Sequence, residues 1–451
     1  MRKKVTALCM TGVLFMAQMG GPADAKSVGT AQVLEAEAFA KKQTISEQIR
    51  EEGEFSDRFL VKYAKKESEE EIRKAAEAVL DLDHLHREKE QERDSLSVEV
   101  SEIEKSIGGY QVLTLTEKVD AVSFQENFLA EISDEIESIQ PDYLLELSSE
   151  MAVGEWEDGD TAQEEISSDT AERYPEMDAR SGQTGHAFLE REEDLQYAWT
   201  FSKGAGVTIA LLDTGVDLTH PDLAGHLREG YDFRNHCTLT YDVSQEMTAA
   251  HGTHIAGILA NTAPEAEILP LKVFENGKAY TSEIIEAIAY AKEQGASIVN
   301  MSFGSTNYNQ ALYEAMSGTD MFFVCAAGNH RRNLQEAPVY PASFGLENSI
   351  SVAAVNQDLG LSYFSNYGAE GVDLAAWGRD VMSAVPSGGC GKRNGTSMAA
   401  AYVSGAAALA ASVRDGAALK EELKKSAWKM SCLEGRVCDG NMLSFSSLDN
   451  M

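Results

Sequence analysis

Short apolar runs alternate with helical stretches through the second half of this 451-residue chain. The runs are too short for helices and fit buried parallel strands. They lie at 207–212, 268–274, 297–301 and 321–327, and the helical stretches at 251–260, 282–294 and 309–316. This alternation predicts an α/β fold with a mostly parallel sheet covered on both faces. In such sheets, functional residues gather at the C-terminal ends of the strands.

The first 25 residues predict an export signal. A basic start at 2–4 precedes an apolar run at 5–19 and a small-residue cleavage site, Ala23-Asp24-Ala25. A retained membrane anchor is the alternative, although the apolar run is short for a bilayer span. We expect cleavage after Ala25 and a soluble, secreted, extracellular protein that leaves no segment in the membrane. Residues 26–54 form a polar leader.

A small α+β domain is predicted at 55–147. Its strands are expected at 59–63, 110–116 and 139–147, the last broken at Pro141, and its helices at 69–80 and 124–132. Between Lys118 and Arg173 there are 17 acidic residues and no Lys or Arg. Residues 148–184 read as an acidic linker, whereas a charged surface on a folded piece fits the earlier part of this tract better. The larger domain spans 185–451.

Charge and cysteines exclude some function classes. The 38 basic and 73 acidic residues give a formal net charge of −35, which repels nucleic acid and anionic lipid. Five cysteines follow the signal, so at least one is unpaired. Cys325 is expected to be a buried thiol, and Cys432 and Cys438 could close a small loop. None has the spacing of metal ligands.

Two motifs supply a carboxylate and a histidine that could act as a base. Asp213-Thr214-Gly215-Val216-Asp217 directly follows the first buried strand, where a carboxylate can orient and stabilise a histidine. Asp213 could instead be a simple loop cap. His251-Gly252-Thr253-His254 opens a helix, and Gly257 lets another element approach closely. His251 is the better base and His254 is expected to be structural, because the pair lacks zinc-helix spacing.

Two further motifs suit a nucleophile and an oxyanion donor. Gly395-Thr396-Ser397-Met398-Ala399-Ala400 leads into an apolar run, so Thr396 and Ser397 can cap a helix. A serine there lies where N–H groups favour negative charge, although an ordinary N-capped helix would look the same. Ala327-Gly328-Asn329 ends a buried strand, and the Asn329 amide could donate to an oxyanion or merely form a turn.

Together these motifs resemble the subtilisin-like serine peptidases. The resemblance covers about 198–428 and includes, in order, the Asp213, His251 and Ser397 motifs, Asn300-Met301-Ser302-Phe303-Gly304 and Ala327-Gly328-Asn329. It implies a secreted serine endopeptidase with Asp213, His251 and Ser397 as its triad and Asn329 in the oxyanion hole. More loosely, residues 59–147 resemble the family's removable propeptide, which assists folding and inhibits the enzyme.

The resemblance also implies the partners and the substrate contacts. Ser302, Phe303 and Gly304 would offer one edge to an extended protein or peptide substrate, with Gly277, Lys278 and Ala279 opposite. His330 would lie near the pocket for the residue before the cut bond. With Arg331 and Arg332, it suggests a preference for acidic or polar residues there, although a solvated loop is equally compatible.

Some residues depart from the family pattern. Ala400-Ala401-Tyr402-Val403 stands where the family usually has a small residue followed by Pro-His-Val, and Ala for Pro is favourable inside a helix. Only 261–265 remains where many relatives carry a calcium-binding loop, so we do not expect that particular calcium site. A structural calcium elsewhere stays open but has no specific motif, and we expect no cofactor for the chemistry. A catalytically silent binding protein on the same fold and an esterase remain the alternatives.

Overall fold

The computed structural model describes residues 55–63, 72–80, 98–103, 109–131, 136–147, 193–241, 244, 248–413 and 419–450. The predicted signal peptide (1–25), polar leader (26–54) and acidic linker (148–184) lie outside the described residues. No helix among the described residues is long and apolar enough to cross a membrane.

The N-terminal part contains the predicted strands and helices. β1 (Phe55–Tyr63), β3 (Tyr110–Asp120) and β4 (Ile136–Pro141) form a sheet with β2 (Val100–Ile103) in the order β2-β3-β1-β4. Residues 72–80 are helical, and α4 spans Ala121–Glu131. The interruption predicted at Pro141 is present, since β4 ends there and β5 (Leu144–Leu147) begins three residues later.

The chain divides into two compact units. The second unit combines 58–63, 102–113 and 140–451, and the first contains the rest of the N-terminal part. Residues 140–147 therefore belong to the same unit as the large C-terminal fold. The reason is that β5 pairs with strands of that fold. The predicted boundary after residue 147 stays a prediction, because it concerns where the precursor is cut and not how the chain folds.

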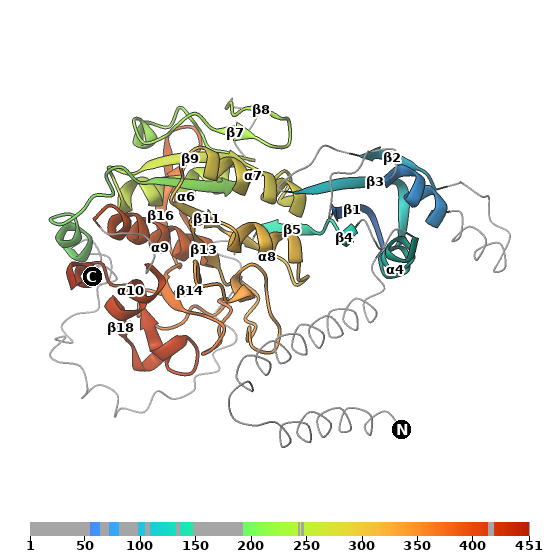
Figure 1. Ribbon diagram of the computed structural model, residues 1–451. Coiled ribbons are helices and arrows are strands. Elements are labelled where there is room, and N and C mark those ends of the chain that lie inside the picture. Colours follow the sequence, from blue (N-terminus) through green and yellow to red (C-terminus); the bar gives the residue numbers. More distant parts are fainter. Residues whose placement is uncertain are drawn as a thin grey trace, which may run out of the picture. The chain divides into compact units, whose positions relative to one another are not determined.

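The large fold is built on a ten-stranded sheet in the order β18-β19-β15-β14-β13-β11-β6-β9-β7-β8 (Figure 1). Its central strands are mutually parallel. They are β6 (Thr208–Asp213), β9 (Glu267–Lys272), β11 (Ile298–Met301), β13 (Phe322–Ala326), β14 (Ser349–Val355) and β15 (Leu374–Trp377). The outer strands are β7 (Tyr231–Asp232), β8 (Cys237–Thr238), β18 (Trp428–Lys429) and β19 (Asn441–Met442).

Helices cover this sheet. Every residue of β6, β13 and β14 is buried, so both faces of the sheet are covered. α9 (Thr396–Ala411) packs across β11, β13, β14 and β15 and against α6 (Ala250–Thr262). α7 (Thr281–Glu293) packs on β6 and on α8 (Gln310–Ser317), and α10 (Leu419–Ser426) packs on α9. The predicted doubly covered parallel sheet is confirmed.

Short elements complete the C-terminal fold. A hairpin is formed by β16 (Val381–Val385) and β17 (Gly389–Arg393). Short 3-10 helices lie at η3 (Pro221–Leu223), η5 (Ala342–Phe344), η7 (Ser431–Leu433), η8 (Cys438–Gly440) and η9 (Ser446–Asn450).

The strand order reverses between β6 and β11. The strands that follow β6 along the chain, β7, β8 and β9, lie on one side of it, while β11 and then β13 extend the sheet on the other. A crevice forms outside the carboxyl ends of strands at such a switch point. β6 ends at Asp213 and β11 at Met301, directly before Ser302. Two of the predicted site segments therefore meet there.

Candidate active site

The structure brings Asp213 and His251 together. His251 Nδ1 lies 2.8 Å from Asp213 Oδ1 and 2.9 Å from Oδ2, and both side chains are buried. Asp213 Oδ1 also accepts a hydrogen bond from the backbone N–H of Thr214 at 2.7 Å. The carboxylate is thus fixed at the end of β6, and His251 is held by the nitrogen that faces it.

Gly252 permits this close approach. A Cβ on Gly252 would lie 2.1 Å from the Gly215 carbonyl oxygen and 3.1 Å from Asp213 Oδ1. The backbone N–H of Gly252 donates to Thr214 Oγ1 at 3.1 Å, which ties the start of α6 to the Asp213 loop. The small residue next to His251 is therefore required by packing.

Ser397 is the second residue of α9 and is buried. Its hydroxyl donates to the backbone carbonyl of Ser302 at 3.4 Å, so it lies over the end of β11. The helix is capped differently from the sequence-based expectation, because Gly395 is the N-cap and supplies no side chain. The Thr396 hydroxyl instead donates to Asn329 Oδ1 at 3.0 Å and accepts from the backbone N–H of Gly328 at 3.1 Å.

Asn329 is oriented by these contacts. Its Oδ1 accepts from the backbone N–H of Thr396 at 2.9 Å as well as from the Thr396 hydroxyl. With the oxygen fixed this way, the amide nitrogen is directed toward Gly395, where an added Cβ would lie 3.3 Å from it. The Asn329 N–H₂ group is thus held beside Gly395, two positions before Ser397.

Asn366 supports the same loop, and the sequence motifs did not single it out. This fully buried side chain donates from Nδ2 to the Ala327 carbonyl at 2.7 Å. Its Oδ1 accepts from the backbone N–H groups of His330 and Arg332 at 3.0 and 2.8 Å. An isolated Asn between a Ser and a Tyr gives no periodic or spacing signal, so only the fold reveals this role.

The two predicted substrate edges flank one strand of this chain. β10 (Lys278–Tyr280) and β12 (Phe303–Gly304) both pair with β5 in antiparallel fashion. Ala279 is opposite Leu145, and Phe303 is opposite Leu147. The backbone N–H of Leu147 also donates to the Gly277 carbonyl at 3.0 Å. Leu147 therefore lies opposite the residue next to Ser302.

His254 lies on the same helix as His251 but faces carbonyls of the β16–β17 hairpin. Its Nε2 is 3.1 Å from the carbonyl oxygens of both Val381 and Gly391. Burial lowers the pKa of His254 to about 3, which keeps the ring neutral. Gly257 permits the hairpin's approach, since an added Cβ would meet Ser383 Oγ at 2.3 Å. The structural role expected for His254 fits these contacts.

The basic segment after Asn329 faces solvent. His330, Arg331 and Arg332 are all exposed, which fits the solvated loop that the sequence left open. Asn366 holds their backbone, which leaves the side chains free to point outward. Any influence they exert on a substrate acts through a screened field.

The described residues contain no group of three or more His, Cys, Asp or Glu that could hold a metal ion. The short 261–265 segment has one carboxylate, Glu265, which is 3.8 Å from Lys203 and half exposed. One acid paired with a lysine does not fit a calcium site. Cys432 and Cys438 are free thiols, as are Cys237, Cys325 and Cys390. Burial raises the pKa of Cys325, in keeping with a core thiol.

The fold and the site define a class of protein. An aspartate–histidine pair and a helix-borne serine, in this chain order on a doubly covered parallel sheet, are typical of the subtilisin-like serine endopeptidases. A family model described as the Subtilase family matches residues 204–432. The chain belongs to the subtilase family.

Known relatives support this assignment. The thermophilic serine proteinase of Bacillus sp. (strain AK1) is 36% identical over 263 residues, covering 55% of this chain and 63% of that protein. Thermitase of Thermoactinomyces vulgaris is 36% identical over 249 residues, covering 52% of this chain and 85% of that enzyme. The match thus spans less than two thirds of the first relative.

A solved structure extends the likeness beyond the family match. Fervidolysin from Fervidobacterium pennivorans, a keratinolytic enzyme related to subtilisin, aligns with a TM-score of 0.67 at 20% identity. The alignment covers 88% of this chain and 62% of that one. At this identity the likeness concerns the fold alone.

Proposed function

We propose that this chain is a secreted serine endopeptidase, made as a precursor whose N-terminal segment inhibits it. One observation carries the proposal. β5 forms the middle strand between β10 and β12, and it ends beside Ser302, whose carbonyl oxygen is 3.4 Å from the Ser397 hydroxyl. The two edges thus accept an extended peptide, and they direct it toward the serine.

The proposed chemistry is acyl transfer. Ser397 Oγ forms a bond to the substrate carbonyl carbon while its proton passes to His251 Nε2. The same proton then goes to the departing amine as the C–N bond breaks, and water hydrolyses the acyl-enzyme by the reverse roles. Asp213 contributes by holding Nδ1–H of His251 and by stabilising the imidazolium, in line with the two short contacts between them.

The oxyanion would be stabilised by Asn329 and by the backbone N–H of Ser397. Thr396 holds the Asn329 oxygen, so the donor group has no need to reorient as charge develops. Ser397 lies in the first turn of α9, where backbone N–H groups lack partners within the helix. Fixed donors of this kind stabilise the transition state more than the ground state.

Substrate main chain would replace β5. Ser302, Phe303 and Gly304 would pair with one side of the peptide, and Gly277, Lys278 and Ala279 with the other. In this structure β5 makes these contacts with all of them except Ser302. His330 stays a candidate for the pocket of the residue before the cut. We expect the precursor to be cut within the first few peptide bonds after Leu147, because that residue lies opposite Phe303, one position from Ser302.

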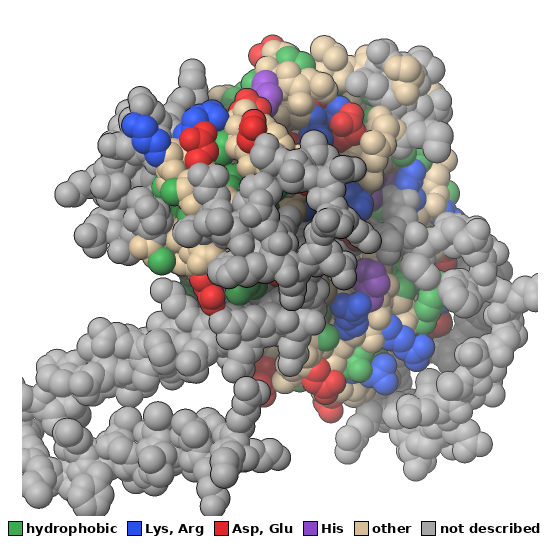
Figure 2. Space-filling model, turned by 90° about the vertical axis from the view of Figure 1, so that its right-hand side faces the viewer, with side chains coloured by type: hydrophobic (Ala, Val, Ile, Leu, Met, Phe, Trp, Pro, Cys, Tyr) green, Lys and Arg blue, Asp and Glu red, His purple; other side chains and the backbone are tan. Residues whose placement is uncertain are grey.

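The N-terminal segment of 55–147 would then be the propeptide. Its tail fills the proposed substrate position, and Asp142 forms hydrogen bonds to Ser282, the second residue of α7. Protein or peptide substrates and this propeptide are the proposed partners. Secretion follows from the predicted signal at 1–25. The described side chains on the face shown in Figure 2 include both acidic and basic groups. We expect no nucleic-acid partner because the net charge of the whole chain is strongly negative.

The unusual sequence after Ser397 does not disturb the helix. α9 runs regularly through Ala401 and Tyr402, and the Tyr402 ring lies edge-on to Trp377 and Phe445 in the core. Ala401 and Tyr402, which stand where the family has Pro-His, are thus accommodated in the packed core. This supports an active enzyme over a silent binding protein.

Ser397→Ala tests the proposal. The variant should remain an uncut full-length precursor and should not digest casein, because removing a triad serine costs about 10⁶-fold in kcat in a related enzyme. Cleavage of casein by the wild-type protein would exclude an esterase without peptidase activity, whether or not simple esters are hydrolysed as well. Maturation and casein digestion by Ser397→Ala at the wild-type rate would refute the proposed function.

A further inference from the structure

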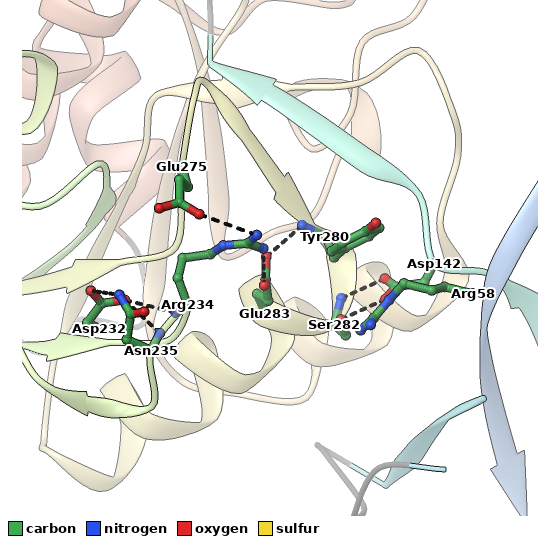
Figure 3. Close-up of polar contacts among 9 residues, drawn as sticks. All are labelled: Arg58, Asp142, Asp232, Arg234, Asn235, Glu275, Tyr280, Ser282 and Glu283. Atoms are coloured by element: carbon green, nitrogen blue, oxygen red, sulfur yellow. Dashed lines mark hydrogen bonds and ion pairs between the residues drawn. The ribbon is translucent and has the colours of Figure 1, made fainter. Parts of the chain in front are cut away.

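A polar network lies beside β10, the proposed substrate edge that precedes α7 (Figure 3). At its centre is Arg234, on the loop that follows β7. Arg234 Nη1 forms an ion pair and hydrogen bond with Glu283, and Nη2 lies 3.8 Å from Glu275 Oε2. One guanidinium therefore contacts the residues on both sides of β10.

Both acidic partners are tied to the edge strand. Glu275 forms an isolated bridge with Lys278, exchanging two backbone hydrogen bonds of 3.0 Å across the turn that leads into β10. Glu283 Oε2 accepts from the backbone N–H of Tyr280 at 2.8 Å, which closes the other end of the strand at the start of α7. The three residues of β10 are thus held at both ends.

Arg234 is itself anchored to the central sheet. Its backbone N–H donates to Asp232 Oδ1 at 2.9 Å, and Asp232 Oδ2 accepts from Lys272 Nζ at 2.9 Å. Lys272 is the last residue of β9, and both it and Asp232 are buried. The network therefore runs from the sheet beside Asp213 to the substrate edge.

We propose that Arg234 is a positioning residue for substrate binding, which sets the place of β10 through Glu275 and Glu283. The inference rests on the proposed peptidase function and identifies a residue that touches neither the triad nor the substrate. Glu283 is the principal partner, because its side chain is 15% exposed, whereas that of Glu275 is 48% exposed and its ion pair is weakened by water.

Loss of the guanidinium would loosen one end of β10. Burial raises the pKa of Glu283, while the Tyr280 N–H and Arg234 both oppose that rise. Without Arg234, the carboxylate loses its charged partner, and its hold on the Tyr280 backbone weakens. An extended peptide that needs β10 would bind less well, while the chemistry at Ser397 would be unchanged.

The test separates binding from chemistry. In Arg234→Ala, we expect KM for a peptide with four or more residues before the cut bond to rise about tenfold, with kcat within about twofold. A small acetyl ester does not reach β10, so its hydrolysis should stay at the wild-type rate. The rate is expressed per active enzyme molecule, and active molecules are counted by labelling Ser397 with a fluorophosphonate. An unchanged KM, or an equal loss on peptide and ester, would overturn the inference.

A matched arginine serves as the control. Arg228 is similarly exposed and joins other elements, donating to Thr208 Oγ1 at 3.2 Å and to the Gln294 carbonyl at 3.0 Å. Arg228→Ala should leave KM for the peptide unchanged, and an equal rise would show a general effect. Since Arg234 acts through Glu283, Glu283→Gln should also raise KM, and the double variant should add little. Full additivity would contradict the coupling.

A second readout does not need activity. In a full-length precursor carrying Ser397→Ala, Arg234→Ala should speed amide hydrogen exchange at 278–280 and 144–147 and leave β6 and β11 protected. Unchanged exchange at 278–280 would overturn the inference. If the wild-type protein fails to take the fluorophosphonate, the proposed function fails, and the exchange experiment still decides whether Arg234 positions β10.

Discussion

The amide of Asn329 illustrates how much one side chain depends on its neighbours. Two donors of Thr396 hold its oxygen, and the backbone of Gly328 is held by the Thr396 hydroxyl. Asn329→Ala removes one oxyanion donor, so we expect kcat to fall about 10²–10³-fold with KM nearly unchanged. Steady-state kinetics on a peptide substrate checks this.

Thr396→Val provides a related comparison. It removes the hydroxyl that orients Asn329 but keeps the backbone N–H bond to Asn329 Oδ1 at 2.9 Å. A smaller fall in kcat than for Asn329→Ala is expected. If the Asn329→Ala variant has the same kcat as the wild type, Asn329 does not stabilise the oxyanion.

The basic residues after Asn329 bear on specificity. His330, Arg331 and Arg332 are exposed, so their field on the residue before the cut is screened. We expect a preference for acidic over basic residues there of about three- to tenfold, reduced or reversed in His330→Glu and Arg331→Glu. Profiling on a peptide library measures it. Selection for Lys, Arg or large aromatics that both variants leave intact would refute the idea.

At the scale of single residues, the sequence singled out the candidate catalytic side chains but not the residues that support them. Asp213, His251, Ser397 and Asn329 each stand in a motif of characteristic residue types. Asn366, Arg234 and the hydroxyl of Thr396 act through contacts between segments far apart in the chain. Spacing along one sequence does not report such contacts.

Among the elements, β5 and α7 explain how the N-terminal segment is held. Ser282 donates to Asp142 from its backbone N–H at 2.9 Å and from its hydroxyl at 2.7 Å, at the start of α7. Arg58 Nε lies 3.3 Å from the same carboxylate. The carboxylate is fully buried, which raises the pKa of Asp142, while the Arg58 guanidinium and the two Ser282 donors oppose that rise.

Asp142→Ala in a fragment of residues 55–147 should therefore weaken inhibition of the mature enzyme. Losing the two hydrogen bonds from Ser282 to this carboxylate costs about 1.5–3 kcal/mol, which corresponds to about tenfold or more in the inhibition constant. Glu146→Ala is the matched control, because Glu146 and its partner Lys278 are both more than half exposed at 3.5 Å. Equal inhibition by all three fragments, with unchanged circular dichroism, would contradict the proposed docking.

The elements themselves followed from sequence wherever the pattern was strong. Short apolar runs located β6, β9, β11 and β13 to within two residues at either end. β2 was missed, because its four residues, Val-Ser-Glu-Ile, are half polar and too few to show alternation. β14 and β15 were missed although all their residues are buried, because they are rich in Ala, which is depleted in strands. The pairing of β5 could not be read from its own sequence, since partners in a sheet are chosen by tertiary context.

The whole molecule joins segments that are distant in the chain. The Asp194 carboxylate accepts from the backbone N–H groups of Phe445 and Ser446 at 2.7 and 2.8 Å, closing the fold across about 250 residues. Parallel strands likewise pair only after long crossovers. Folding that depends on such non-local contacts is slow, because loop-closure entropy is lost before the contacts form.

The proposed propeptide would act on this step. Residues 180–451 expressed alone should give little active enzyme until the 55–147 fragment is added, because β5 supplies the strand that organises β10 and β12. Refolding yield, counted as phosphonate-labelled serine, is the measurement. Efficient refolding without the fragment would remove the folding role and leave only inhibition.

The most direct test of the account is the intact mass of the purified protein after treatment with a serine-directed phosphonate. We predict that the wild-type protein carries one phosphonate on Ser397 and lacks the residues up to at least Leu147. Ser397→Ala, treated in the same way, should keep the uncut N-terminal segment and take no label. An unlabelled wild-type protein, or a Ser397→Ala protein that matures normally, would contradict the assignment of Ser397 as the nucleophile that processes its own precursor.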